Sequence, residues 1–282
     1  MGLFLCCSMS GCSPDFQDYL STKKITVEQI TQEPAPVLSH VIQPEPLADP
    51  EIAPSPTVLR VGYSHDVPPY IYKKDKKIQG IEEELAQQFG QFAGKEVQFV
   101  KVPAKRATEA LEKGLIDIIL PGRKIIKRNN APVTFSDPYL RAGQILLVRA
   151  QDLALFSNGI YSLDGSTFTF GVIKASSGEQ FMTRSLKNVK IIPFETVEAA
   201  IMALKTKHID LFLHDAPTIC HFAALNKAAG LTPILNLVTE EYIGWEMRTA
   251  DTELQHQANL FIQQSKADGR LQKTIKHWIP NL

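Results

Sequence analysis

The chain has 282 residues, which is enough for one large domain or two of modest size. Its formal net charge of +0 argues against a polyanion such as nucleic acid as the main partner. No run of 18 apolar residues occurs, so the sequence predicts no membrane-spanning helix. Cys6, Cys7 and Cys12 cluster at the start and Cys220 stands alone, a spacing that excludes a disulfide framework and a CxxC metal site. We therefore expect no metal or other cofactor, and a buried, inert thiol at Cys220.

The first segment, residues 1–12, is short, apolar and rich in small residues. It resembles a bacterial lipoprotein signal, in which a cysteine preceded by small residues receives the lipid. The run Met9-Ser10-Gly11-Cys12 fits that pattern, so the resemblance implies lipidation at Cys12. Two departures are the absence of Lys or Arg before the apolar run and the shortness of the run. A misassigned start would explain both, and the alternative is a frayed terminus with chance cysteines.

The next segment, residues 13–56, contains no glycine and has seven prolines between Pro34 and Pro56. Such a composition cannot build a core and favours extended polyproline conformations. We interpret it as a semi-rigid tether between a lipid anchor and a folded domain. The alternative is a disordered N-terminal segment without a function.

The folded part begins with a predicted strand at residues 59–63 and a helix that ends at Gly94, with Ile81, Leu85 and Phe89 on one face. The stretch ALEKGLIDIIL (residues 110–120) then recurs 93 residues later as ALKTKHIDLFL. Each copy is typical of a helix end, a turn and a buried strand, and a hydrophobic strand precedes each.

The repeat therefore predicts two βαβ units of similar design and two α/β lobes with a cleft between them. Ligands of open α/β sheets bind at the carboxyl ends of the strands. We expect the functional residues just after Leu120 and Leu213. In the second lobe a strand at residues 168–173 leads to Ser176, Ser177 and Glu179, the pattern of a helix start whose N–H groups could face an anion.

Eight segments in this order resemble the extracellular solute-binding proteins of family 3, the amino-acid receptors of ABC importers. They are VGYSHDVPPY, GIEEELAQQF, EALEKGLIDIIL, FSDPY, FGVIKASSGEQF, ALKTKHIDLFLHDAP, YIGWEMR and KADGRLQKTIKHW. The resemblance covers residues 58–280. It implies the type II periplasmic-binding-protein-like α/β fold, with two lobes that close on the ligand by hinge motion.

The same resemblance implies two crossover strands, near residues 140–143 and 240–244. The first lobe is then discontinuous and comprises residues 57–140 and 242–282. The second lobe comprises residues 141–241.

In this family an Asp after the second repeat strand binds the ammonium group of the ligand, and hydroxyl residues at a helix start assist. The matching residues here are Asp215, Ser176 and Ser177. Asp215 could instead be a plain helix N-cap before Ala216-Pro217. In the loop after the first strand, Ser64 and Asp66 are candidate contacts.

Aromatic walls usually enclose the side chain of such a ligand, and Tyr63, Tyr70 and Tyr139 are candidates. The pocket aromatic of the family aligns with Val67, which makes Val67 a candidate wall residue. Tyr70 falls where the family has a structural Phe, so we expect it to pack in the core.

The loop after the first repeat strand departs from the family pattern, because a basic run at residues 121–128 replaces the usual small hydroxyl residues. The carboxylate-binding Arg aligns with Asn129, one residue after Arg128. A one-residue shortening makes Arg128 the preferred candidate, with Arg123 as the substitute and Gly122 beside it. Alternatively, the basic run is simply a solvated loop, or it favours a ligand with extra negative charge.

The sequence thus predicts a monomeric, lipid-anchored receptor on the periplasmic or extracytoplasmic face. It would bind an amino acid or a similar small carboxylate and deliver it to the membrane permease of an ABC importer. One alternative is a periplasmic dehydratase-type enzyme, for which Glu179 and His214 are the tempting acid–base groups. Another is a surface lipoprotein that senses a solute without transport.

Overall fold

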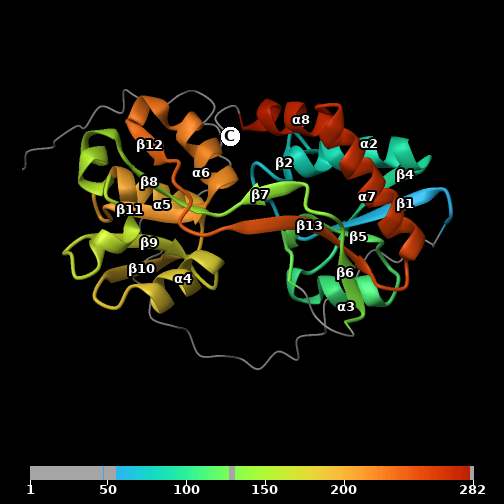
Figure 1. The fold of residues 1–282 in the computed structure, drawn as a ribbon, viewed down its shortest axis with the longest axis horizontal. Coiled ribbons are helices and arrows are strands. Elements are labelled where there is room, and N and C mark those ends of the chain that lie inside the picture. Colours follow the sequence, from blue (N-terminus) through green and yellow to red (C-terminus); the bar gives the residue numbers. More distant parts are fainter. Residues whose placement is uncertain (1–46, 48–54, 127–130, 280–282) are drawn as a thin grey trace, which may run out of the picture.

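The computed structural model describes Leu47, residues 55–126 and residues 131–279. Cys12, almost all of the Pro-rich segment and Arg128 lie outside the described residues. The described chain forms two α/β lobes that lie side by side (Figure 1), which confirms the predicted fold class. None of the helices in this part of the chain is long and apolar enough to cross a lipid bilayer.

The sheet of the first lobe has the order β4-β1-β5-β13-β6, and β7 also pairs with β13. Its strands are β1 (Val58–Tyr63), β4 (Glu96–Lys101), β5 (Ile118–Lys124), β6 (Val133–Phe135), β7 (Leu140–Ala142) and β13 (Glu241–Arg248). The strand β1 is parallel to β4 and β5, whereas β13 runs antiparallel to its neighbours. A short hairpin of β2 (Tyr72–Lys74) and β3 (Lys77–Gln79) precedes the first long helix.

In the described part of the chain, four α-helices cover this sheet. They are α2 (Ile81–Ala93), α3 (Ala107–Glu112), α7 (Thr252–Ala267) and α8 (Arg270–Trp278). The helices α2, α7 and α8 pack together in one core, and α3 covers a separate cluster that includes Ile116 and Ile119. As predicted, α2 ends at Gly94, whose φ of 66° is in the left-handed region that glycine tolerates.

The sheet of the second lobe has the order β10-β9-β11-β8-β12. Its strands are β8 (Gln144–Arg149), β9 (Thr169–Ile173), β10 (Lys190–Phe194), β11 (Leu211–Asp215) and β12 (Leu231–Ile234). Its helices are α4 (Ser177–Ser185), α5 (Val197–Lys205) and α6 (Ala216–Leu225). Cys220 on α6 is buried and free, and burial raises the pKa of its thiol to about 11, as expected for an inert cysteine.

Two connections join the lobes, one from β7 into β8 and one that returns along β13 (Figure 1). They touch where Gln144 N–H donates to Thr239 Oγ1 at 2.9 Å. A Cβ atom on Gly143 would lie only 1.9 Å from the carbonyl oxygen of Thr239, so the close approach requires glycine here.

The sequence repeat corresponds to equivalent positions of the two sheets. The orders β4-β1-β5-β13 and β10-β9-β11-β8 match, with three parallel strands followed by one antiparallel strand. The repeated aspartates make equivalent hydrogen bonds in the two lobes. Asp117 Oδ2 accepts from the Arg60 backbone N–H at 2.9 Å, and Asp210 Oδ2 accepts from the Thr169 backbone N–H at 2.9 Å.

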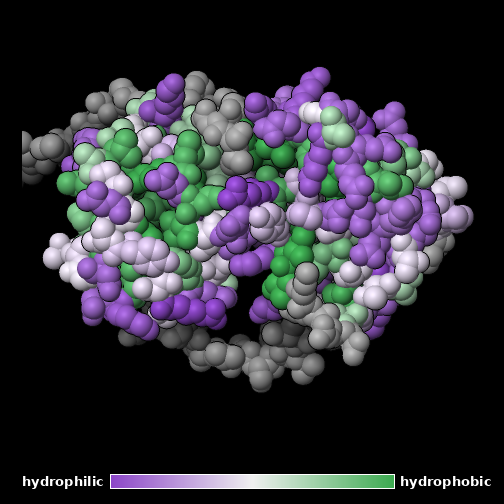
Figure 2. Space-filling view, viewed as in Figure 1, coloured by the Kyte–Doolittle hydropathy of each residue, from purple (hydrophilic) through white to green (hydrophobic). Residues whose placement is uncertain are grey.

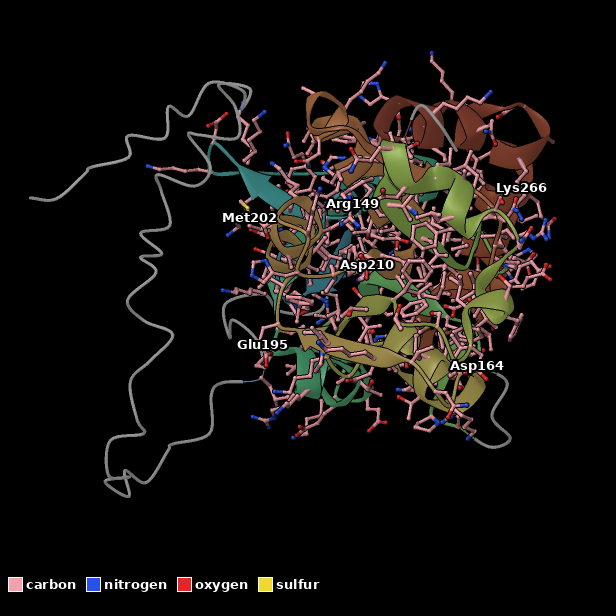
Figure 3. All side chains as sticks on the ribbon, turned by 90° about the vertical axis from the view of Figure 1, so that its left-hand side faces the viewer. Arg149, Asp164, Glu195, Met202, Asp210 and Lys266 are labelled. Atoms are coloured by element: carbon pink, nitrogen blue, oxygen red, sulfur yellow. The ribbon has the colours of Figure 1, made fainter. Side chains whose placement is uncertain are left out.

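An arginine at the end of the antiparallel strand completes each cluster. Arg248 Nη2 lies 3.3 Å from Asp117 Oδ1. In the second lobe, Arg149 Nη2 lies 3.2 Å from Asp210 Oδ1, and both residues are labelled in Figure 3. Each Nη1 donates to two backbone carbonyls, at equivalent positions of the two repeats: Leu111 and Ile116 for Arg248, and Leu204 and Ile209 for Arg149. The repeat is therefore a structural module, held at its base by an aspartate and an arginine.

Replacement of Asp117 by Ala should lower the free energy of unfolding by about 3–5 kcal/mol, because Arg60, 4% exposed, loses its partner. Urea denaturation would measure the loss. Asp268→Ala is the matched control, since Asp268 forms an exposed ion pair with Arg270 and should not change stability measurably. Equal stability of the two variants would contradict the role given to Asp117.

Candidate functional site

A cavity of about 280 Å³ lies at the carboxyl ends of β1 and β5 in the first lobe. Figure 2 shows that the surface is also hollowed between the two lobes, below the crossover strands. The cavity wall is mainly aliphatic, with a few polar side chains. It is lined by Gly62, Tyr63, Ser64, His65, Val67, Val102, Ala104, Ala107, Ile119, Leu120, Pro121, Gly122 and Arg123.

Five candidate site residues of the first lobe line this cavity: Tyr63, Ser64, Val67, Gly122 and Arg123. Asp66 is not among the lining residues. Its Oδ1 accepts from the backbone N–H of Lys73 at 3.1 Å, so Asp66 holds the loop against β2.

Tyr139, a candidate aromatic wall residue, is not among the residues that line this cavity. The side chain is 3% exposed, its ring lies 5.7 Å from that of Trp245, and its hydroxyl donates to Glu82. A Cβ atom on Gly122 would collide with this hydroxyl. Tyr139 therefore packs in the core beneath Gly122 of the cavity wall, where a buried carboxylate accepts the hydrogen bond of its hydroxyl.

Glu82 is that carboxylate, and sequence reasoning missed it. It is fully buried in the first turn of α2 and accepts from the Gly122 backbone N–H and from Trp245 Nε1, both at 3.0 Å. Burial raises its pKa, while these hydrogen bonds and the one from Tyr139 act in the opposite direction. The spacing of Glu82 on α2 could have indicated its burial, because the residues four and seven positions later are apolar and buried on the same helix face.

Asp215 ends β11 and begins α6. Its Oδ1 accepts from the Thr218 backbone N–H at 3.0 Å, which confirms the N-cap, and its Oδ2 is paired with His214 Nδ1. Burial disfavours the charged form of Asp215, yet the neighbouring His214 and the hydrogen bonds with Thr218 lower the pKa of this carboxyl. Asp215 is thus an ionised carboxylate at the carboxyl end of the strand.

The two serines also lie at a helix start, as predicted. Ser176 Oγ accepts from the Glu179 backbone N–H at 3.2 Å, and Glu179 Oε2 accepts from the Ala175 backbone N–H at 2.7 Å. This arrangement resembles a capping box, except that Glu179 reaches the N–H of Ala175, one residue before the N-cap Ser176. Ser177 Oγ accepts from Gln144 Nε2 at 3.2 Å, which connects α4 to the crossover strand.

A direct contact between the lobes involves Tyr70. Its hydroxyl donates to Asp215 Oδ1 at 3.0 Å, although Tyr70 belongs to the loop after β1 of the first lobe. Burial first, and then the charge of Asp215, raise the pKa of Tyr70 well above its ordinary value, so the hydroxyl remains a donor. The expectation that Tyr70 packs in the core is confirmed by its 7% exposure, but its polar contact was not foreseen.

The described part of the basic loop is neutralised by glutamates of β13. Arg123 Nη1 lies 2.7 Å from Glu246 Oε2, and Lys124 Nζ lies 3.5 Å from Glu241 Oε1. Arg128 lies outside the described residues. Within residues 55–126 and 131–279, no group of three His, Cys, Asp or Glu side chains is placed to hold a metal ion.

Residues 59–281 match the family model of the bacterial extracellular solute-binding proteins, family 3, and the chain belongs to this family. It is therefore a solute-binding receptor, and membership of an extracellular family places it on the extracytoplasmic side of the membrane.

Relatives with similar sequences are also solute-binding proteins. The chain is 28% identical to the ABC transporter glutamine-binding protein of Bacillus subtilis over 208 aligned residues. The alignment covers 72% of this chain and 73% of the relative. It is 24% identical to a probable histidine-binding protein of Neisseria gonorrhoeae, with 77% of this chain and 81% of the relative covered. The relatives are binding proteins.

Solved structures show the same fold. A putative ABC-transporter binding component of Wolinella succinogenes, complexed with lysine, superposes with a TM-score of 0.71 at 26% identity. An ancestral cationic amino acid solute-binding protein superposes with a TM-score of 0.70 at 26% identity. Each covers 79% of this chain and 96% of the other.

Replacement of Tyr70 by Phe should lower the free energy of unfolding by about 1–3 kcal/mol, because a hydrogen bond to a charged acceptor is lost. Small-angle scattering of the unliganded protein should also show a larger radius of gyration, since this contact ties the lobes together. Tyr161→Phe, at an exposed side chain, is the control. An unchanged radius in Tyr70→Phe would show that the bond does not hold the lobes.

The lowered pKa of Asp215 predicts a pH dependence. A carboxyl with a folded pKa below its unfolded value of about 3.9 contributes stability above that pH, and the contribution is lost as pH falls through the folded pKa. The difference in unfolding free energy between the wild type and Asp215→Asn should therefore shrink as pH falls below about 4. Urea titrations from pH 6 to pH 3 measure it, and a constant difference would refute this assignment.

Proposed function

We propose that this receptor captures an amino acid or a similar small carboxylate between its lobes and delivers it to the permease of an ABC importer. The observation that carries the proposal is the ionised Asp215 at the carboxyl end of β11, in contact with the first lobe through Tyr70. A partly buried carboxylate at this edge suits an ammonium group. The named relatives, which include glutamine-binding and histidine-binding proteins, support an amino-acid ligand.

In this proposal Asp215 accepts from the ammonium group, and the hydroxyls of Ser176 and Ser177 assist from the start of α4. Ser64, Val67 and Gly122 form the wall of the first lobe. The ligand carboxylate is taken by an arginine of the loop after β5, for which Arg128 and Arg123 are the candidates. Asp66 and Tyr139 have supporting roles only.

We assign residues 57–140 and 242–282 to one rigid lobe and residues 141–241 to the other. Bending would occur at the connections β7–β8 and β12–β13, where the lobes are joined by backbone. A ligand that contacts both lobes binds the closed state more tightly, and this difference in affinity would drive closure.

We further propose that lipidation at Cys12 anchors the receptor to a bacterial membrane, with residues 13–56 as the tether, and that it acts as a monomer. Detergent phase separation tests the anchor. The proposal is supported if the wild type enters the detergent phase and Cys12→Ala does not.

A dehydratase-type activity is the alternative, since one structural neighbour is an ancestral amino acid-binding protein described as a precursor of cyclohexadienyl dehydratase. The two acid–base candidates have other tasks. Glu179 accepts from the backbone at the start of α4, and His214 is paired with Asp215. We therefore favour a binding protein over an enzyme; a non-transport sensor would bind ligand in the same way.

A thermal-shift screen of the full chain against the twenty amino acids and a set of small carboxylic acids tests the proposal. A ligand at 100 times its dissociation constant should add about 2.7 kcal/mol of stability. The shift should disappear in Asp215→Asn, which keeps the shape of the N-cap but removes the charge. Asp268→Ala is the control for net charge. No shift with any compound would contradict the proposed ligand class.

A further inference from the structure

Leu47, in the Pro-rich segment that precedes the folded part, packs on the first lobe. Its side chain is partly buried and lies against the apolar cluster beneath α3, which includes Val102, Leu111 and Ile119. In Figure 1 this helix lies on the side of the first-lobe sheet away from α8. A leucine of the segment interpreted as a tether is thus part of a hydrophobic cluster of the folded domain.

The sequence repeat explains why this cluster has room for an additional side chain. Ile119 of β5 is equivalent to Phe212 of β11, 93 residues later. Val102, which follows β4, is equivalent to Phe194 of β10, because β1 and β4 pair in the same register as β9 and β10. At both positions the second lobe has a phenylalanine where the first has a smaller aliphatic residue. Protein interiors are close-packed, so the first lobe accommodates another apolar group at this cluster.

The same cluster reaches the candidate site. Part of the space in the first lobe is the cavity of that site, which Val102, Ala107 and Ile119 also line. Leu47 is not among the residues that line this cavity, so it contacts another part of the cluster. The cluster therefore connects the leucine to the wall of the candidate site.

The chain between Leu47 and β1 is long enough for this contact. The Ser55 carbonyl accepts from the Val58 N–H at 3.3 Å, and the Thr57 carbonyl accepts from the Glu96 N–H at 2.8 Å, so the chain is attached to the lobe again at the start of β1. Eight residues of extended chain reach about 29 Å at most, whereas the six residues of β1 span about 20 Å. The link can therefore run along the whole length of the strand.

The composition of the segment favours such a contact. Leu47 follows Pro46, and Pro44 and Pro50 lie within three residues of it. Proline restricts the free chain to extended conformations, which reduces the entropy lost when the leucine is fixed. Residues 44–51 carry three acidic side chains and no basic one, whereas residues 101–113, which contain α3, carry four basic and two acidic side chains. The opposite net charges add an attraction between the segment and this face.

We propose that Leu47 docks the Pro-rich segment on the first lobe at the cluster beneath α3. The partner of this apolar surface is thus the chain's own N-terminal segment. The free part of the proposed tether then ends at Leu47, and a membrane anchor would hold the first lobe while the second lobe moves on closure. The docking itself requires neither a ligand nor a lipid, so it can be tested apart from the proposed function.

Cleavage by a glutamyl endopeptidase tests the docking on the full chain. Glu51 lies between Leu47 and Ser55, which are both attached to the first lobe, whereas Glu28 lies further towards the N-terminus. A protease cleaves a fixed segment only in the fraction of molecules in which that segment is released. Leu47→Ala should therefore increase the rate of cleavage after Glu51 by about 5- to 10-fold, with no change after Glu28. Mass spectrometry of the products separates the two sites.

Thermal unfolding and hydrogen exchange give independent readouts of the same contact. Leu47→Ala should lower the Tm by about 2–4 °C, since a partly buried leucine loses its packing. Amide exchange should accelerate in α3, which covers the cluster, but not in α5, the helix at the equivalent position of the second lobe.

Two further variants make the result specific. Leu47→Met fills a similar volume and should retain the cleavage rate, the Tm and the exchange of the wild type. Leu38→Ala removes a leucine from the same segment, at a position to which the proposal gives no contact, and it should also behave as the wild type.

The outcomes separate this inference from the proposed function. Unchanged cleavage after Glu51 in Leu47→Ala, or the same increase in Leu38→Ala, would overturn the docking. If sedimentation velocity shows a wild-type dimer that Leu47→Ala dissociates, the partner of the surface is the segment of a second copy, and docking within one chain is wrong. A wild type that binds no amino acid but shows the expected cleavage pattern would contradict the receptor's ligand class and leave the docking intact.

Discussion

The partly buried ion pair between an aspartate and an arginine at the base of each lobe is the interaction on which the structure depends. Asp117 and Asp210 each accept from the backbone of the neighbouring parallel strand, and each contacts an arginine of the antiparallel strand. A charge that is partly removed from water is costly unless it is paired, so each pair favours this strand order at that point. Strand order in turn decides which loops meet at the opposite, carboxyl edge, where the candidate site lies.

At that edge the two lobes are unlike, although the sheets below them are alike. The first lobe offers a mainly aliphatic cavity with an anchored arginine, and the second offers an ionised carboxylate with helix-start hydroxyls. A ligand with a carboxylate and an ammonium group is complementary to both halves only when they face each other. In the proposed function, the need to pair two ligand charges on two lobes would couple ligand binding to closure.

Several local features could be predicted from the sequence because their causes are local. The cap at Ser176 with Glu179, the αL residue Gly94 and the N-cap at Asp215 follow from short-range spacing. The repeat predicted the two βαβ units because the buried strand and the preceding helix are adjacent in sequence. The contact between Tyr139 and Glu82 could not be predicted, because the two residues are 57 positions apart in the sequence.

The sequence by itself determined the elements, their duplication and the loops that reach the carboxyl edge, because apolar periodicity and turn residues act over a few positions. Only the tertiary structure decided which polar groups meet. Tyr70 and Asp215 are 145 residues apart, and Arg123 and Glu246 are 123 apart, so neither pairing leaves a short-range pattern. The first pairing depends on the placement of one lobe against the other, and the second depends on the register of β13 against β5, which the packing of whole sheets and helices establishes.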